Sequence, residues 1–140
     1  MKPKILSIRW AERPDLELED LSLEDVLESG KGKLLPLQLE LRIAYRPDRD
    51  SDLFYLLIAC PEALKGNDRF RGFKPHKYTL VLSTYDWTEL RDLLEQKVSN
   101  CENEDWQCSL DLLKGHFAWE FDEESWDPAS REWLRDQLGS

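Results

Sequence analysis

The chain has 140 residues and a formal net charge of −10 at pH 7. Its length fits one domain with a substantial core, and six Trp, four Tyr and five Phe supply too much apolar surface for a disordered chain. Nucleic acid and anionic membranes are poor partners for so negative a surface, whereas a basic protein fits it, unless the charge serves only solubility.

The first half of the chain predicts three strands and one short helix. Alternation over residues 4–10 predicts a strand at a sheet edge, which a turn at 12–14 ends. Ser22 then predicts the cap of a short helix. Strict alternation over 35–45 predicts a strand with one buried face, whereas residues 52–60 are apolar on both faces and predict a central strand.

A fourth strand and a helix are predicted next. Residues 77–83 are rich in β-branched, aromatic and aliphatic side chains, which favour a strand. Thr84 or Asp86 can cap the helix that follows. The apolar stripe of this helix has the spacing of three and four residues that one helix face requires, and it consists of Trp87, Leu90, Leu94 and Val98.

A second, shorter helix and a fifth strand complete this run. The stripe of the helix consists of Trp106, Leu110 and Leu113. We expect the helix to end at Gly115 in the left-handed conformation. Residues 116–121 alternate and predict a strand with Phe117, Trp119 and Phe121 on one face. We assign Trp119 and Phe121 to the core.

The predicted elements define an α+β fold. We expect a mostly antiparallel five-stranded sheet, with the three middle strands in meander order and the two central helices packed on one face. Asp127 as a cap and Pro128 at the first helical position predict a C-terminal helix over 127–138. No repeat or linker divides the sequence, so we expect a single domain over residues 1–140.

The sequence carries no recognised catalytic or metal-binding motif. Cys101 and Cys108 are seven residues apart without a C-x-x-C pair, and neither His76 nor His116 has a recognisable catalytic context. We therefore expect that the protein is not an enzyme and that it binds no cofactor and no metal. Three cysteines without a signal peptide or an apolar stretch long enough to span a bilayer indicate reduced thiols and a cytoplasmic protein.

Acidic residues cluster on either side of the last predicted strand. If the fold brings them together, they form a patch that can bind a basic partner, with a large aromatic residue as an anchor. Acids also cap helices and solvate loops, which is the alternative for each one. The candidate partner-binding residues are Glu102, Glu104, Asp105, Asp122, Glu123, Glu124 and Trp126.

Several short segments occur in a characteristic order and spacing. They are Ala59-Cys60-Pro61 followed by Leu64, the stretch from Gly72 to Leu80, Tyr85-Asp86-Trp87, Cys101 followed by Trp106, and Trp119-Glu120-Phe121-Asp122. Together they resemble the Imm8 family of immunity proteins from bacterial polymorphic toxin systems, over about residues 37–124. The resemblance implies an inhibitor, without chemistry of its own, that binds a cognate toxin and protects the producing cell and its kin.

The resemblance also bears on the partner. It implies a protein toxin, and the acidic surface predicts that the toxin is basic at the contact face. We expect a monomer or a homodimer. The alternative is a general protein-interaction or small-molecule-binding α+β domain with no toxin partner, and a deep pocket lined by His76 or His116 would favour small-molecule binding or catalysis.

Overall fold

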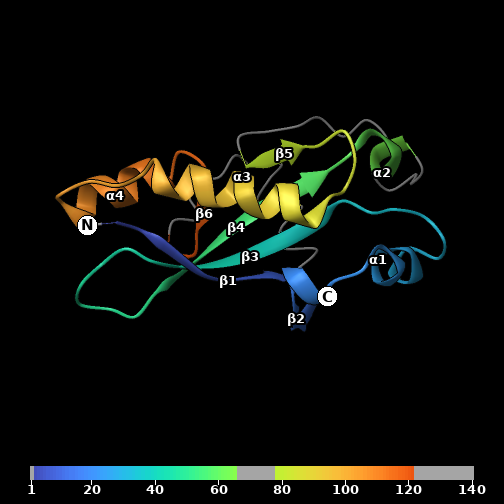
Figure 1. Ribbon diagram of the computed structural model, residues 1–140, viewed down its shortest axis with the longest axis horizontal. Helices are drawn as coiled ribbons and strands as arrows, with labels where there is room; N and C mark the ends of the chain where they lie inside the picture. Colours follow the sequence, from blue (N-terminus) through green and yellow to red (C-terminus); the bar gives the residue numbers. More distant parts are fainter. Residues whose placement is uncertain (1, 66–77, 122–140) are drawn as a thin grey trace.

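The computed structural model describes residues 2–65 and 78–121, which form an α+β fold with a mostly antiparallel sheet (Figure 1). The strands are β1 (Lys4–Trp10), β2 (Arg13–Glu17), β3 (Leu37–Ala44), β4 (Asp52–Ala59), β5 (Thr79–Val81) and β6 (Ala118–Trp119). The helices are the 3₁₀-helix η1 (Leu18–Asp20) and the α-helices α1 (Leu23–Ser29), α2 (Pro61–Lys65), α3 (Trp87–Ser99) and α4 (Trp106–Leu113). The described residues thus confirm the fold class, with six strands instead of five. The predicted helix at 127–138 lies outside them.

The order of the sheet is β2-β1-β3-β4-β5, and β6 also pairs with β4. The expected meander of the three middle strands is correct in its neighbours but wrong in direction, because β5 runs parallel to β4. The reason is the connection between Ala59 and Thr79, which contains α2 and is long enough for a crossover. A tight turn would have reversed the chain instead.

The expectation that the first strand lies at the sheet edge is wrong. β2 pairs outside β1, with Arg9 opposite Glu17 and Trp10 opposite Arg13 across an irregular register. The turn predicted at 12–14 therefore ends earlier, and the chain resumes an extended conformation at Arg13. Charged side chains on so short an edge strand discourage pairing with another molecule.

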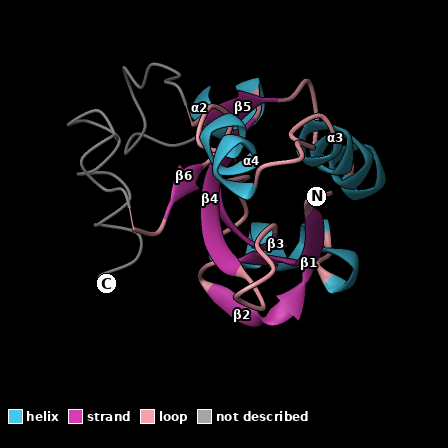
Figure 2. Ribbon diagram, turned by 90° about the vertical axis from the view of Figure 1, so that its left-hand side faces the viewer, coloured by secondary structure: helices cyan, strands magenta, loops and turns pink. Residues whose placement is uncertain are grey.

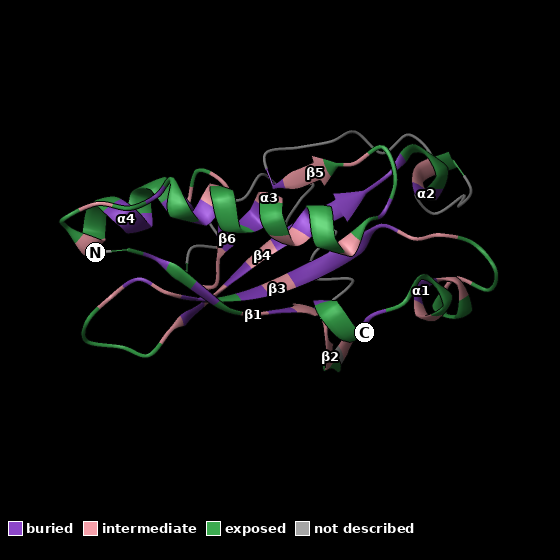
Figure 3. Cartoon of the chain, viewed as in Figure 1, coloured by how far each residue is buried: buried purple, intermediate pink, exposed green. Residues whose placement is uncertain are grey.

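The core lies between the sheet and the helices α3 and α4 on one side of it (Figure 2). Leu39 and Leu41 of β3 are fully buried, and they lie opposite Leu56 and Phe54 of β4 in the register. The alternation in β3 and the central place of β4 are both confirmed. Figure 3 shows these two strands mostly buried, behind the exposed outer surface of α3.

The predicted helix signals are largely confirmed. Ser22 and Asp25 form a reciprocal capping box at α1, and the Asp86 carboxylate caps α3 by accepting from two backbone N–H groups. The stripe of α3 is buried at Leu90, Leu94 and Val98 and partly buried at Trp87.

Two expectations near the end of the described chain are wrong. Gly115 does not adopt the left-handed conformation, because α4 ends in a right-handed turn in which the N–H groups of Gly115 and His116 bond to the last carbonyls. Phe121 is not a core residue, since 54% of its surface is exposed. β6 has only two residues, so the chain leaves the sheet before Phe121 can turn inward; Phe117 is fully buried and Trp119 partly so.

We predict that Leu94→Ala lowers the free energy of unfolding by about 2–5 kcal/mol, because it leaves a cavity at a fully buried position. Urea unfolding followed by tryptophan fluorescence measures the change. Gln96→Ala, on the exposed side of the same helix, is the control and should stay close to wild type. Equal losses in the two variants would contradict the assigned inner face of α3.

Candidate interaction surface

Three of the residues predicted to bind a partner lie in the loop between α3 and α4. Glu102, Glu104 and Asp105 are all exposed. Asp105 also has a structural role, because its carboxylate caps α4 and accepts from the backbone N–H of Gln107 at 3.0 Å. The other predicted residues lie outside the described part of the chain, and they are Asp122, Glu123, Glu124 and Trp126.

The loop between β3 and β4 reaches the same end of the molecule as α4 (Figure 1). The guanidinium carbon of Arg46 lies 4.4 Å from the ring centroid of Trp106, the first residue of α4. Asp48 holds this arginine in place by accepting two hydrogen bonds, at 2.9 and 2.7 Å. These hydrogen bonds keep the pKa of Asp48 below its ordinary value. The positive charge of Arg46 is therefore balanced within the loop.

A buried carboxylate, Asp52, joins this loop to β6. Its Oδ2 accepts a hydrogen bond from the Tyr45 hydroxyl at 2.5 Å and another from Trp119 Nε1 at 3.1 Å. Its Oδ1 lies 3.0 Å from Nε of Arg49, in an ion pair that lacks hydrogen-bond alignment. Burial, and then the hydrogen bond to Asp52, raise the pKa of Tyr45, so its hydroxyl remains a donor.

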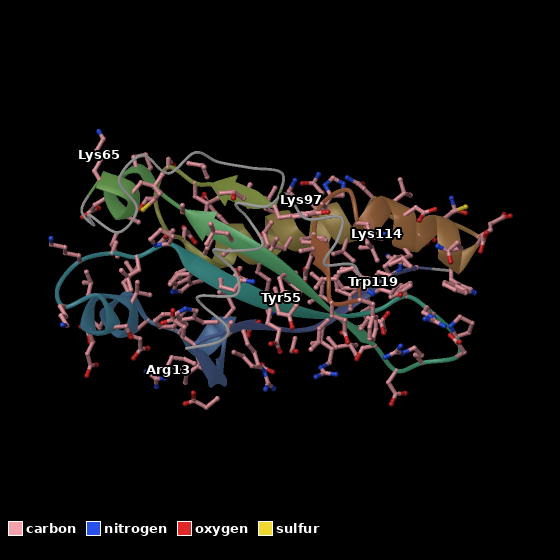
Figure 4. The ribbon with its side chains drawn as sticks, turned by 180° about the vertical axis from the view of Figure 1, so that it is seen from behind. Arg13, Tyr55, Lys65, Lys97, Lys114 and Trp119 are labelled. Atoms are coloured by element: carbon pink, nitrogen blue, oxygen red, sulfur yellow. The ribbon has the colours of Figure 1, made fainter. Side chains whose placement is uncertain are left out.

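The outer side of this arrangement is aromatic. The rings of Trp119 and Phe121 meet edge to face at 5.2 Å, and Arg49 lies over the Phe121 ring at 5.1 Å. Lys114 lies over the ring of Trp119 at 5.4 Å (Figure 4). The ring of Tyr45 lies 6.5 Å from that of Trp106, so Tyr45 connects the Arg46–Trp106 pair to Asp52 and the residues around it. We call the connected group the aromatic–arginine cluster, and it consists of Tyr45, Arg46, Arg49, Asp52, Trp106, Trp119 and Phe121.

The cluster was not predicted from the sequence, in which residues 46–50 only connect two predicted strands. Its arginines lie about sixty residues or more from the rings that they cover, so no local spacing marks the pairs. The usable signal was compositional, since Arg, Trp and Tyr are the residue types enriched where interfaces gain most of their energy.

The geometry offers more for binding than for catalysis. Beside the cluster is an open depression of about 560 Å³, lined by Arg42, Pro47, Asp48, Arg49, Asp50 and Ser51. Within residues 2–65 and 78–121, no group of three or more His, Cys, Asp or Glu side chains could hold a metal. Over the same residues, no helix is both long and apolar enough to cross a membrane.

A comparison with protein families identifies the chain. A model of the family described as immunity protein 8, or Imm8, matches residues 14–124. The chain belongs to the Imm8 family. Members of this family belong to polymorphic toxin systems, neutralise a cognate toxin and are typically inhibitors without enzymatic activity. Searches of curated proteins and of solved structures gave no match.

The family match confirms the resemblance found in the sequence. It spans every residue of the aromatic–arginine cluster and the acidic loop beside it. The surface at this end of the Imm8 protein is therefore part of the region that the family shares.

We predict that Asp52→Ala lowers the free energy of unfolding of this Imm8 protein by about 2 kcal/mol. Its removal leaves Tyr45 and Trp119 without their acceptor, and a buried donor without a partner costs about 1–3 kcal/mol. Asp50→Ala, an exposed acid in the same loop, is the matched control and should leave stability unchanged. Urea unfolding of both variants decides, and a loss no greater than that of the control contradicts the role of Asp52.

His116 predicts a pH dependence of stability. Burial, and then the positive charge of Lys97, lower its pKa below the ordinary 6.5. The unfolded chain therefore binds a proton at this site before the folded protein does, so the free energy of unfolding should fall as the pH drops from about 7.5 to about 5.5. His116→Asn should flatten this decline in urea unfolding measured across the range, and an unchanged slope would show that His116 does not cause it.

Proposed function

We propose that this Imm8 protein protects the producing cell and its kin by binding a cognate toxin in the cytoplasm, through the end of the sheet that carries the α3–α4 loop. The observation behind this proposal is an exposed acidic loop beside the aromatic–arginine cluster, within the family-matched region. Inhibition is by occupancy: the bound protein blocks the toxin's access to its substrate or a motion that the toxin needs.

The charge balance at this end supports a basic toxin surface. Arg46 is neutralised by Asp48, and Arg49 by Asp52. Glu102 and Glu104 are exposed, and within the described part of the chain they form no ion pair. Uncompensated acids attract a basic partner over several ångströms of water and raise the rate of encounter, while contributing less to the final affinity.

The proposal includes acids that follow the cluster in the sequence. Asp122, Glu123 and Glu124 come directly after Phe121, and Trp126 follows them. We propose that these four residues also take part in binding the toxin, the acids through their charge and Trp126 through its ring. A run of acids flanking large aromatic residues is the composition of an interface with a charged rim and an apolar centre.

We predict that wild-type protein restores growth to cells expressing the toxin domain encoded in the neighbouring open reading frame. With the purified toxin domain, the Glu102→Lys, Glu104→Lys double variant should associate about tenfold more slowly at low salt, and the difference should shrink as salt screens the charges. Stopped-flow or biolayer interferometry measures both rate constants.

The matched control is the Glu24→Lys, Glu28→Lys double variant of α1. It makes the same change in net charge at the opposite end of the molecule (Figure 1), so it should associate nearly as fast as wild type. Equal slowing in both variants would assign the effect to overall charge and remove the α3–α4 loop from the proposal. Failure of the wild-type protein to bind and to protect would overturn the function itself.

A further inference from the structure

We propose that the aromatic–arginine cluster is the anchor of the toxin complex, with the Phe121 ring entering an apolar cavity on the toxin and Arg49 binding a carboxylate at the rim of that cavity. This inference rests on the proposed function and deepens it. It assigns the lifetime of the complex to residues other than the acids, which only accelerate its formation.

The first observation is that Phe121 is exposed but held in place. About half of its surface faces solvent, although the ring packs edge to face on Trp119 and lies under Arg49. A ring fixed before binding loses little conformational entropy when a partner covers it. Aromatic residues that are fully covered at the centre of an interface are among those that contribute most to affinity.

The second observation is the buried charge that fixes this geometry. Asp52 is completely buried at the start of β4, and it orients Tyr45, Arg49 and Trp119 at once. Burying a carboxylate has a large desolvation cost, so a buried ion pair contributes little net stability compared with an apolar core. What the arrangement does provide is a fixed position for one arginine and one tryptophan at the surface.

The third observation distinguishes the two arginines. Asp48 accepts from Nε and Nη2 of Arg46, so one edge of this guanidinium is already occupied while its plane covers Trp106. Arg49 contacts Asp52 through Nε, and within the described part of the chain no partner bonds to its two terminal nitrogens. Arg49 is one of the residues that line the open depression, together with Arg42 and Ser51.

An oriented guanidinium with free terminal nitrogens selects its ligand. A planar fork of N–H donors matches a carboxylate, which can accept two parallel hydrogen bonds. We therefore assign the occupant: a surface of the toxin with an apolar cavity, an Asp or Glu at its edge, and Lys or Arg farther out, opposite Glu102 and Glu104. The basic rim matches the uncompensated acids of the α3–α4 loop.

The test compares Phe121→Ala with Leu23→Ala. Leu23 is also a large apolar residue with a similar exposure of 43%, but it lies on α1, at the opposite end of the molecule (Figure 1). Both variants should fold as stably as wild type in urea. With the toxin domain from the neighbouring open reading frame, Phe121→Ala should raise Kd at least tenfold, mainly through faster dissociation and with little salt dependence, whereas Leu23→Ala should change Kd by less than twofold.

A second variant tests the planar guanidinium of Arg49 while keeping its positive charge. Arg49→Lys keeps the positive charge beside Asp52 but removes the planar fork, so it should weaken binding by about tenfold while the free energy of unfolding stays near that of wild type. Combining it with Phe121→Ala gives a double-mutant cycle. Losses that are not additive would support a shared site on the toxin.

The outcomes separate this inference from the proposed function. If the wild-type protein binds and protects while Phe121→Ala and Arg49→Lys bind with wild-type dissociation rates, the cluster is not the anchor, but the function stands. An equal loss in Leu23→Ala also overturns the inference. If the wild-type protein neither binds nor protects, the function falls, and the assigned occupant falls with it.

Discussion

One buried carboxylate determines how this end of the molecule is built. Asp52 is the first residue of the central strand β4, and its side chain holds Tyr45 from the preceding loop, Arg49 within that loop and Trp119 of β6. Without it, the two-residue β6 would be held mainly by its few backbone bonds to β4 and by the neighbouring Glu120, whose carboxylate accepts from the backbone N–H of Leu53. A single charge thus links the β3–β4 loop and the start of β4 to β6, which lies 67 residues later in the chain, and the exposed Phe121 takes its position from that link.

The elements that were predicted correctly from the sequence are those whose apolar residues recur with a regular spacing. The stripe of α3 and the alternation of β3 each bury one face, so spacing alone assigns their inner residues. The errors have other causes. The direction of β5 depends on the connection that precedes it, and the pairing of β2 depends on the neighbouring strand β1. The exposure of Phe121 depends on where β6 ends. None of these is a property of the segment itself.

The same distinction applies to the candidate interaction surface: one part of it could be predicted from local sequence patterns and the other part could not. Glu102 and Glu104 could be placed on the α3–α4 loop because the helices on both sides of it have strong patterns. The aromatic–arginine cluster could not be foreseen, since Arg46 meets Trp106 and Arg49 meets Phe121 only after the sheet and helices have been assembled. Side chains that meet only in the tertiary structure have no characteristic spacing in the sequence. The sequence therefore predicts only the acidic part of this surface and not the aromatic–arginine cluster beside it.

The two halves of the surface have different physical consequences for an inhibitor that acts by occupancy. Long-range attraction between exposed charges increases how often the partners meet, and salt weakens it. Contacts that exclude water determine how long they remain together, and differences among related complexes arise mostly in dissociation. A toxin released inside a cell continues to act whenever it is free, so protection depends on the bound lifetime as well as on encounter. An acidic rim around a rigid aromatic centre supplies both, and its rigidity comes from Asp52, a residue that contacts no solvent.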